Sequence, residues 1–209
     1  MKLRKPRKRR TYRQVARAQS TAGTARKVID AFTICAGERW FDEITLREVA
    51  MRAGVTVRSV IRRFGSKEGL VRAMVEDFGS DLDAEFVSAP GDIDGAVERL
   101  FDAYERVGDG AIRNVAQEHR VPALQPLIDH GRASHRRIVA GQFAPWLDRL
   151  EGKARRDLLD ALVIDTDVYV WKLLRRDMRR SVRDAKAAVR RLIEGTLAAY
   201  TPKDGRRSS

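Results

Sequence analysis

Apolar residues recur at helical spacing along most of the chain, from about residue 24 to residue 200. Val28, Ile29 and Phe32 illustrate the pattern, because they lie within one helical turn of each other and share one face. Gly37 follows this stretch and is well placed to end the helix. Strict alternation of apolar and polar residues, which is typical of strands, is nearly absent. The chain is therefore predicted to be all-α.

Residues 45–64 are predicted to form two short helices joined by a tight turn. Thr45 and Glu48 match the capping box that opens a helix, and Gly54 can adopt the positive φ of the turn that follows. Thr56 can then cap the second helix. Two short helices around one glycine have the spacing of a helix-turn-helix, in which the second helix enters the major groove of DNA.

The second of these helices is expected to have two different faces. We expect Val60, Ile61 and Phe64 to face the core. The residues expected to point outward are Thr56, Val57, Arg58, Arg62 and Arg63. Arginine reads guanine with two hydrogen bonds and apolar groups meet the thymine methyl group, so the outward face suits a major groove. An ordinary solvated helix in an all-α bundle is the alternative interpretation.

Further helices are predicted after a linker at Ala89-Pro90-Gly91. Gly108-Asp109-Gly110 is expected to separate two of them, and one uninterrupted helix is expected over residues 154–178. The fold class is thus a three-helix N-terminal helix-turn-helix domain followed by a C-terminal bundle of about six helices. The expected parts are a basic disordered arm (1–23), the helix-turn-helix domain (24–66), the bundle domain (67–201) and a disordered tail (202–209).

Positive charge is concentrated at the start of the chain. The formal net charge is +13, and residues 1–20 contain nine Lys or Arg and no Asp or Glu. Residues 80–150 carry a net charge of −4, so the charge is unevenly distributed. A basic arm of this kind favours contact with DNA, along phosphates or in a minor groove, although a solvated tail fits the arm equally well.

The sequence argues against a membrane protein, an enzyme and a metalloprotein. Its apolar runs are shorter than the ~18 residues that a membrane span needs, and no apolar segment follows the basic start, so we expect a cytoplasmic protein. The chain has no Gly-rich phosphate loop and no Ser/His/Asp grouping. Cys35 is expected in the core, and His130 and His135 lie off the spacing of a helical metal site. No catalytic residue, metal or cofactor is therefore expected.

Residues 44–74, ITLREVAMRAGVTVRSVIRRFGSKEGLVRAM, resemble the DNA-binding signature of the TetR family of bacterial transcriptional regulators. The chain departs from the pattern at Ile61, where the family usually has a tyrosine whose hydroxyl binds a phosphate. The resemblance implies a homodimer that binds a palindromic operator in a sequence-specific way. It further implies a repressor that an unidentified small-molecule effector releases from the operator, with the effector and the dimer contacts in the bundle domain.

The resemblance also implies which residues contact double-stranded DNA. Thr45 and Arg47 would contact the backbone from the first short helix. Thr56, Val57 and Arg58 would face bases, with Arg58 as the main reader of sequence. Further contacts to phosphates or adjacent bases are implied for Ser59, Arg62, Arg63 and Lys67.

Ligand binding and dimerisation are assigned to the bundle domain. The candidate ligand-binding residues are Phe101, Tyr104, His119, His130, Ser134, Gln142, Phe143, Trp146 and Tyr169. For each aromatic residue, a place in the core is the alternative. The last two helices carry apolar stripes that we interpret as too extensive for a single bundle to hide. The residues predicted to form the dimer interface are Leu158, Leu162, Thr166, Val170, Val189, Leu192, Ile193 and Leu197.

Two other functions remain open at this point. A non-specific architectural DNA-binding protein would bind any duplex with the same salt dependence. A ligand-binding or dimerisation module with a vestigial helix-turn-helix is compatible with the isoleucine at position 61, which has no hydroxyl for a phosphate contact.

Overall fold

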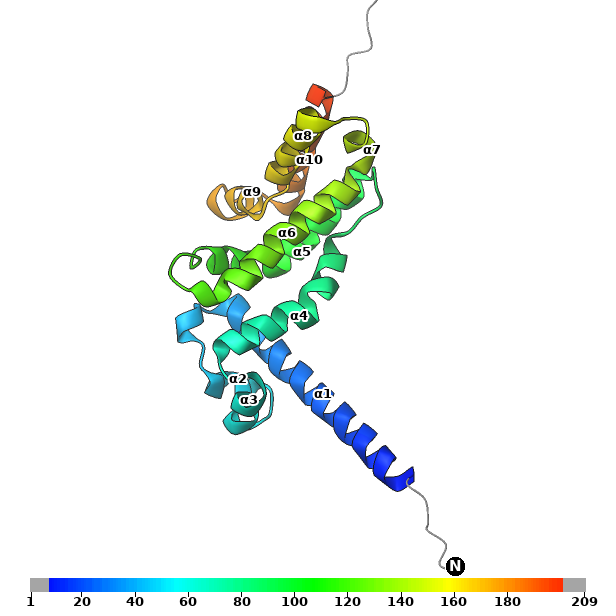
Figure 1. Cartoon of the computed structure of the whole chain (residues 1–209). Helices are drawn as coiled ribbons and strands as arrows, with labels where there is room; N and C mark the ends of the chain where they lie inside the picture. Colours follow the sequence, from blue (N-terminus) through cyan, green and yellow to red (C-terminus); the bar gives the residue numbers. More distant parts are fainter. Residues whose placement is uncertain (1–7, 201–209) are drawn as a thin grey trace, which may run out of the picture. The chain divides into compact units, whose positions relative to one another are not determined.

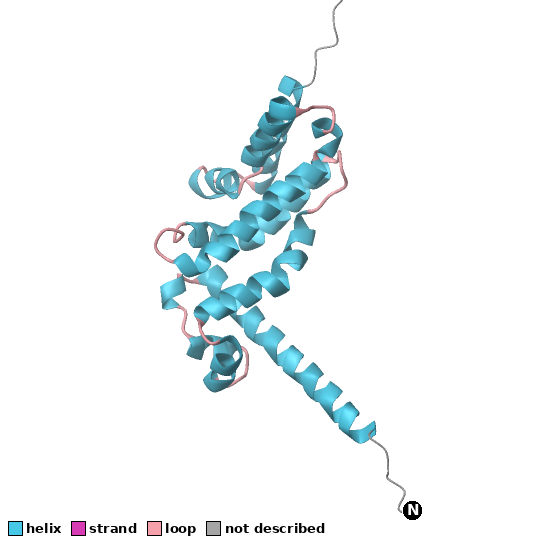
Figure 2. Ribbon diagram, in the orientation of Figure 1, coloured by secondary structure: helices cyan, strands magenta, loops and turns pink. Residues whose placement is uncertain are grey.

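The computed structural model describes the backbone of residues 8–200 and the side chains of residues 23–76 and 83–200. Over the described backbone the regular elements are all helices, joined by loops and turns without strands (Figure 2). The expected all-α fold is confirmed. The chain divides into two compact units after Met74.

The first unit comprises α1 (Lys8–Glu38), the short 3-10 helix η1 (Phe41–Glu43), α2 (Leu46–Arg52), α3 (Val57–Phe64) and the first part of α4 (Lys67–Phe86) (Figure 1). Its core contains buried side chains from each of these α-helices, among them Phe32, Val49, Val60 and Leu70. The expected boundary at residue 66 lies before α4, whereas the observed boundary lies inside it. The buried side chains in the first turns of α4 explain this difference, because they add that part of the helix to the first unit.

α1 begins at Lys8, well before the expected start at residue 24. Residues 8–23 of the expected disordered arm are therefore helical, while residues 1–7 lie outside the described part of the chain. The stretch between Pro6 and Gly23 has no other glycine or proline and is rich in Arg, Ala and Gln, which have high helix propensity. This local preference favours continuation of the helix. The expected tail at residues 202–209 also lies outside the described residues.

The second unit is a bundle built on α5. Its elements after α4 are α5 (Ile93–Val115), η2 (Pro122–Leu124), α6 (Gln125–Gln142), α7 (Ala144–Leu147), α8 (Gly152–Asp165), α9 (Val168–Lys172), the π-helical turn η3 (Leu173–Asp177) and α10 (Val182–Tyr200). α5 packs against α6, α9 and α10, and α8 packs against α6 and α10. Phe101, Phe143, Leu162, Trp171 and Ile193 are almost completely buried between these helices. The α-helices of this unit fit the expected bundle of about six.

The predicted break at Gly108-Asp109-Gly110 is wrong, since α5 continues through it without interruption. Gly108 is buried, and a Cβ atom at this position would lie 2.5 Å from Cζ3 of Trp171. The glycine is therefore needed for the close approach of the Trp171 ring to α5. A glycine with this packing role does not need to end the helix.

The single helix predicted over residues 154–178 is also wrong, because α8 ends and α9 begins around Thr166. The Thr166 hydroxyl donates to the carbonyl of Leu162 at 2.7 Å, and its own carbonyl accepts from the hydroxyl of Tyr104 at 3.3 Å. Asp167 then caps α9 by accepting from the backbone N–H of Tyr169 at 2.8 Å. These bonds satisfy the backbone and side-chain groups that the break in the helix leaves open.

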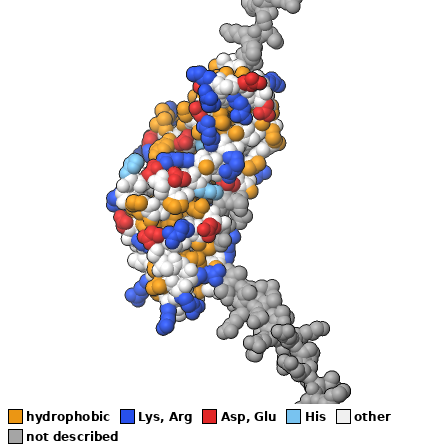
Figure 3. Space-filling model, in the orientation of Figure 1, with side chains coloured by type: hydrophobic (Ala, Val, Ile, Leu, Met, Phe, Trp, Pro, Cys, Tyr) orange, Lys and Arg blue, Asp and Glu red, His pale blue; other side chains and the backbone are white. Residues whose placement is uncertain are grey.

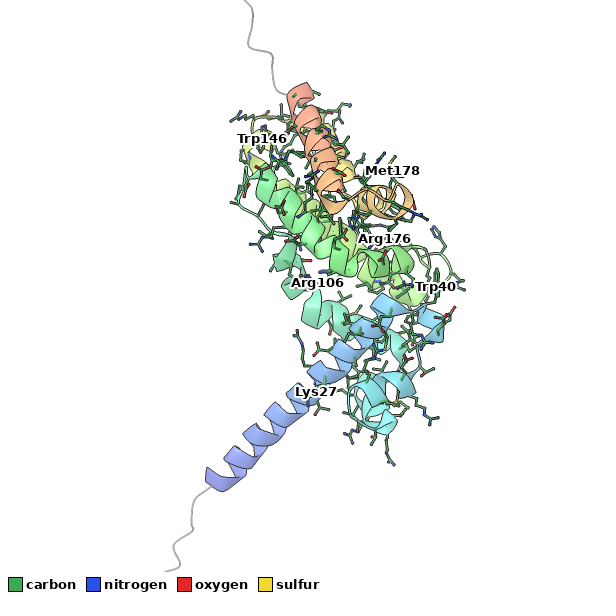
Figure 4. The ribbon with its side chains drawn as sticks, turned by 180° about the vertical axis from the view of Figure 1, so that it is seen from behind. Lys27, Trp40, Arg106, Trp146, Arg176 and Met178 are labelled. Atoms are coloured by element: carbon green, nitrogen blue, oxygen red, sulfur yellow. The ribbon has the colours of Figure 1, made fainter. Side chains whose placement is uncertain are left out.

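Two ion pairs hold the π-helical turn against α5. Arg175 contacts Glu105 at 2.6 Å, and Arg176 contacts Asp109 at 2.8 Å while its guanidinium stacks 4.4 Å from the Trp171 ring centroid. Arg176 lies on the segment between α9 and α10 (Figure 4). Its guanidinium lowers the pKa of Asp109, and that of Arg175 lowers the pKa of Glu105. The turn is thus bound to α5 by charged contacts around a buried tryptophan.

The packing of Trp171 on α5 predicts that Gly108→Ala destabilises the second unit. The free energy of unfolding should fall by about 1–3 kcal/mol, because the new methyl group displaces the indole ring. Gly131→Ala in α6 is the matched control, since nothing lies within 4 Å of its added Cβ. The control should leave stability unchanged or raise it by up to about 1 kcal/mol. Urea unfolding followed by circular dichroism measures both, and equal effects would contradict the packing role.

Candidate nucleic-acid interface

α2 and α3 form the predicted helix-turn-helix. The Thr45 hydroxyl accepts from the backbone N–H of Glu48 at 3.1 Å and caps α2. Gly54 has the expected positive φ of 68°, which turns the chain after α2. The Thr56 hydroxyl accepts from the N–H of Ser59 at 3.2 Å and caps α3. These short-range bonds explain why two helices of seven and eight residues begin and end where the sequence predicts.

Burial of one face of α3 determines which of its side chains point outward. Val60 is 1% exposed and Phe64, one turn later, is half-buried. Arg58, Arg62 and Arg63 are exposed, as predicted. Thr56 is also exposed, whereas Val57 and Ser59 are half-buried.

Ile61 differs from the prediction that it faces the core. Its side chain is 49% exposed, on the same face of α3 as Val57 and Arg58. Residues three and four positions apart are neighbours on a helix surface, so position 61 lies beside positions 57 and 58, at the edge of the buried face that contains position 60. The outward face of α3 is therefore partly apolar as well as cationic.

The arginines of this surface have no carboxylate partners among the described residues. Arg47, Arg58, Arg62 and Arg63 are exposed and form no ion pair with a described side chain. The chain contains no Asp or Glu from residue 49 to residue 67. Figure 3 shows blue Lys and Arg side chains over α2 and α3 without red carboxylates between them. A surface with this potential attracts a polyanion such as DNA.

Two other arginines of the first unit pair with carboxylates. Arg39 contacts Glu48 at 2.9 Å, and Arg52 contacts Glu38 at 2.9 Å. The hydrogen bond from Arg52 to Glu38 accompanies a raised pKa of Arg52. Glu38 of α1 and Glu48 of α2 thus pair with these two arginines and not with the arginines of α3.

Lys67, for which a phosphate contact is predicted, contacts Phe41 within the first unit. Its ammonium donates to the carbonyl of Phe41 at 2.8 Å and lies 4.5 Å from the Phe41 ring centroid. The lysine therefore ties the start of α4 to η1. Glu68 lies in the first turn of α4. Hydrogen bonds from the Ser66 side chain and from the backbone lower the pKa of its carboxyl group. The DNA contacts of all nine residues, Lys67 included, remain predictions.

Four of the five aromatic residues predicted to bind a ligand lie in the core of the second unit or pack against it. Phe101, Tyr104 and Phe143 are buried, and Trp146 packs against the same cluster. The ring centroid of Tyr104 lies 6.0 Å from that of Trp171. Burial raises the pKa of Tyr104, so its hydroxyl remains a hydrogen-bond donor at neutral pH. These rings contribute to packing irrespective of any ligand.

The polar residues predicted to bind a ligand are divided between structural contacts and the exposed surface. Gln142 donates to the carbonyl of Phe86 at 2.8 Å and so fixes the linker after α4. Ser134 accepts from Arg137 at 3.2 Å, and Nε2 of His130 lies 3.6 Å from Asp83. The remaining two residues, His119 and Tyr169, are exposed.

The polar contact between His135 and Thr166 is not predicted by the sequence. Nε2 of His135 lies 3.0 Å from the Thr166 hydroxyl. Because that hydroxyl already donates to the carbonyl of Leu162, it accepts from His135. Burial lowers the pKa of His135, which favours the neutral ring. No local pattern in the sequence links these two residues, which lie on α6 and at the end of α8.

Most residues predicted to form the dimer interface are buried inside their own chain, so this prediction is wrong for them. The six buried residues are Leu158, Leu162, Thr166, Val189, Ile193 and Leu197. The reason is that α8 and α10 pack against each other and against α5 and α6, which hides both stripes. Of the remaining two, Val170 is half-buried and Leu192 is 45% exposed. Ile164 of α8, which the prediction omitted, is 65% exposed.

The described residues lack two further features. Within them, no helix is both long and apolar enough to cross a membrane. Nor do the described His, Cys, Asp and Glu side chains come together in a group of three that could hold a metal ion. Cys35 is fully buried, and burial raises the pKa of its thiol.

Comparisons with known proteins agree with this geometry. Residues 28–74 match the sequence model of the family described as bacterial regulatory proteins, tetR family. A transcriptional regulator from Rhodococcus sp. Rha1 superposes with a TM-score of 0.64 and 17% sequence identity, over 84% of this chain and 96% of that chain. A tetR-family transcriptional regulator from Streptomyces coelicolor gives 0.63 and 21%, over 84% and 81%. No curated protein matches the sequence. The structural likenesses show a shared fold, and the family match covers the helix-turn-helix.

Proposed function

Because the chain carries the DNA-binding domain of the tetR family and the fold of its regulators, we propose that it is a sequence-specific transcriptional regulator. It acts as a homodimer on a palindromic operator in the bacterial cytoplasm, and a small-molecule effector bound in the second unit releases it. The observation that carries the DNA-binding role is the exposed face of α3, whose arginines lack carboxylate partners among the described residues. This surface is suited to phosphates and to base edges.

The position of each arginine along α3 suggests its role. Arg58 lies in the first turn of α3, and the N-terminal residues of a recognition helix contact base edges. Its planar fork matches the N7 and O6 atoms of guanine. Arg62 and Arg63 lie in the last turn, where we expect them to contact mainly the phosphate backbone.

Arg58→Ala should relax the preference at one base pair of each half-site, at a cost of about 1–3 kcal/mol for the preferred base. Arg63→Ala is the matched control and should weaken binding to all sequences alike. It should also reduce the slope of log affinity against log salt by about one. Selection from randomised duplexes, followed by titrations at several salt concentrations, measures both effects. A uniform loss of affinity with an unchanged consensus for Arg58→Ala would mean that Arg58 contacts phosphate.

Dimerisation is proposed because one short recognition helix binds weakly and two-fold symmetric proteins bind paired half-sites. α8 and α10 lie side by side (Figure 1) and each has one large, exposed apolar side chain, Ile164 and Leu192. We propose that these helices pack against the same pair of a second copy, as a four-helix interface.

Leu192→Glu should give a folded monomer, because the side chain is exposed in the single chain and its charge opposes burial between two copies. Leu162→Ala is the control, since Leu162 is fully buried and its loss should lower stability by about 2–5 kcal/mol without dissociating the dimer. Analytical ultracentrifugation and thermal unfolding separate the two effects. A folded Leu192→Glu dimer would contradict the proposed interface.

α4 is the element proposed to couple the effector to the DNA-binding surface. Its first part is buried in the first unit, and Asp83 near its other end contacts Arg137 of α6 at 2.7 Å. The Phe86 carbonyl accepts from Gln142 of the same helix at 2.8 Å. An effector that moves α6 would therefore move α4, and binding of effector and of operator would weaken each other by the same factor.

A further inference from the structure

An isoleucine lies within the cationic face of α3. Ile61 is 49% exposed, one turn after Val57 and directly before Arg62. Its exposed side chain cannot be explained by packing within the first unit, whose core at this helix is formed by Val60. An exposed apolar side chain is common on protein surfaces, so exposure alone assigns no role. Ile61, however, lies beside Arg58 on the exposed surface of α3, which is the surface proposed to bind DNA.

The chemistry of Ile61 excludes one kind of DNA contact and favours another. An isoleucine side chain has no hydrogen-bond donor, so it cannot bind a phosphate oxygen through a hydrogen bond. In the major groove, thymine differs from the other bases by an exposed C5-methyl group that contacts apolar side chains. Burying such a methyl group against Ile61 removes apolar surface of both groups from water, and this contributes affinity for thymine only.

We propose that Ile61 is a specificity-determining residue that packs on the C5-methyl group of a thymine in each operator half-site. The inference rests on the proposed function, because it requires α3 to lie in the major groove. It goes beyond that function by assigning an apolar contact to a helix face whose other exposed side chains are mostly arginines. Val57 lies one turn earlier on the same face, where we expect it to contact a different base pair. A variant at Val57 therefore serves as the comparison for a variant at Ile61.

The test removes single methyl groups from the DNA. After the preferred duplex has been selected with the wild-type protein, each thymine of one half-site is replaced in turn by uracil, which lacks only the C5-methyl group. Dissociation constants are then measured at one salt concentration for the wild type, for Ile61→Ala and for Val57→Ala. Circular dichroism checks that both variants are folded.

One thymine should lose about fourfold in wild-type affinity on replacement, which corresponds to ~0.8 kcal/mol for one buried methyl group. Ile61→Ala should bind the thymine and uracil duplexes at that position equally, whereas Val57→Ala should retain the fourfold difference there. If Ile61→Ala responds to every uracil as the wild type does, the inference is overturned. If the wild-type protein selects no preferred duplex, the proposed function fails, and the inference fails with it.

Discussion

The orientation of α3 depends on the burial of Val60 in the core of the first unit. α3 has only eight residues, and isolated helices shorter than ~12 residues are marginal in water, so its formation relies on packing. Once Val60 is buried, the rotation of the helix about its axis is fixed. Arg58, Ile61 and Arg62 then lie outward together, and the hydroxyl of Thr56 fixes where the helix starts. The proposed DNA-binding surface is thus a consequence of one apolar contact and one cap.

Some arginines of the first unit pair with carboxylates, whereas the arginines of α3 lack such partners among the described residues and are available to bind a polyanion. Arg39 and Arg52 pair with carboxylates of α1 and α2, and exposed pairs of this kind contribute little to stability. The arginines of α3 have no such partner among the described residues, and neighbouring like charges repel each other. A surface of this kind is unfavourable for the isolated chain and favourable for binding a polyanion. In the second unit, by contrast, Arg175 and Arg176 are used to fix a π-helical turn.

The sequence predicts the local features of the fold better than its long-range contacts. The roles of Thr45, Gly54 and Thr56 depend only on residues a few positions away. The structure has the predicted caps at the two threonines and the predicted turn at the glycine. Ile61 was misplaced because it lies at the edge of the apolar face centred near Val60, and the sequence does not show whether a residue at that edge is buried or exposed. Gly108 was misread because only its contact with Trp171, far along the chain, distinguishes close packing from a helix break.

The same limitation explains the error in the dimer interface. An apolar stripe shows that a helix face is buried, but not whether its own chain or a second copy buries it. In this chain the stripe residues of α8 and α10, such as Leu162 and Ile193, are buried by other helices of the same bundle. The large apolar side chains of α8 and α10 that are exposed in the single chain are Ile164, which the stripe omits, and Leu192.

The most direct test of sequence-specific binding compares two duplexes of equal length and composition, the selected operator and a shuffled version. Equilibrium titrations with the wild-type protein at several salt concentrations give both affinities, and ultracentrifugation gives the number of chains bound to the operator. The account predicts that two chains bind the operator and that its affinity exceeds that of the shuffled duplex at least ~10³-fold. Equal affinities with parallel salt dependence would contradict it, because they would describe a protein that binds only the DNA backbone.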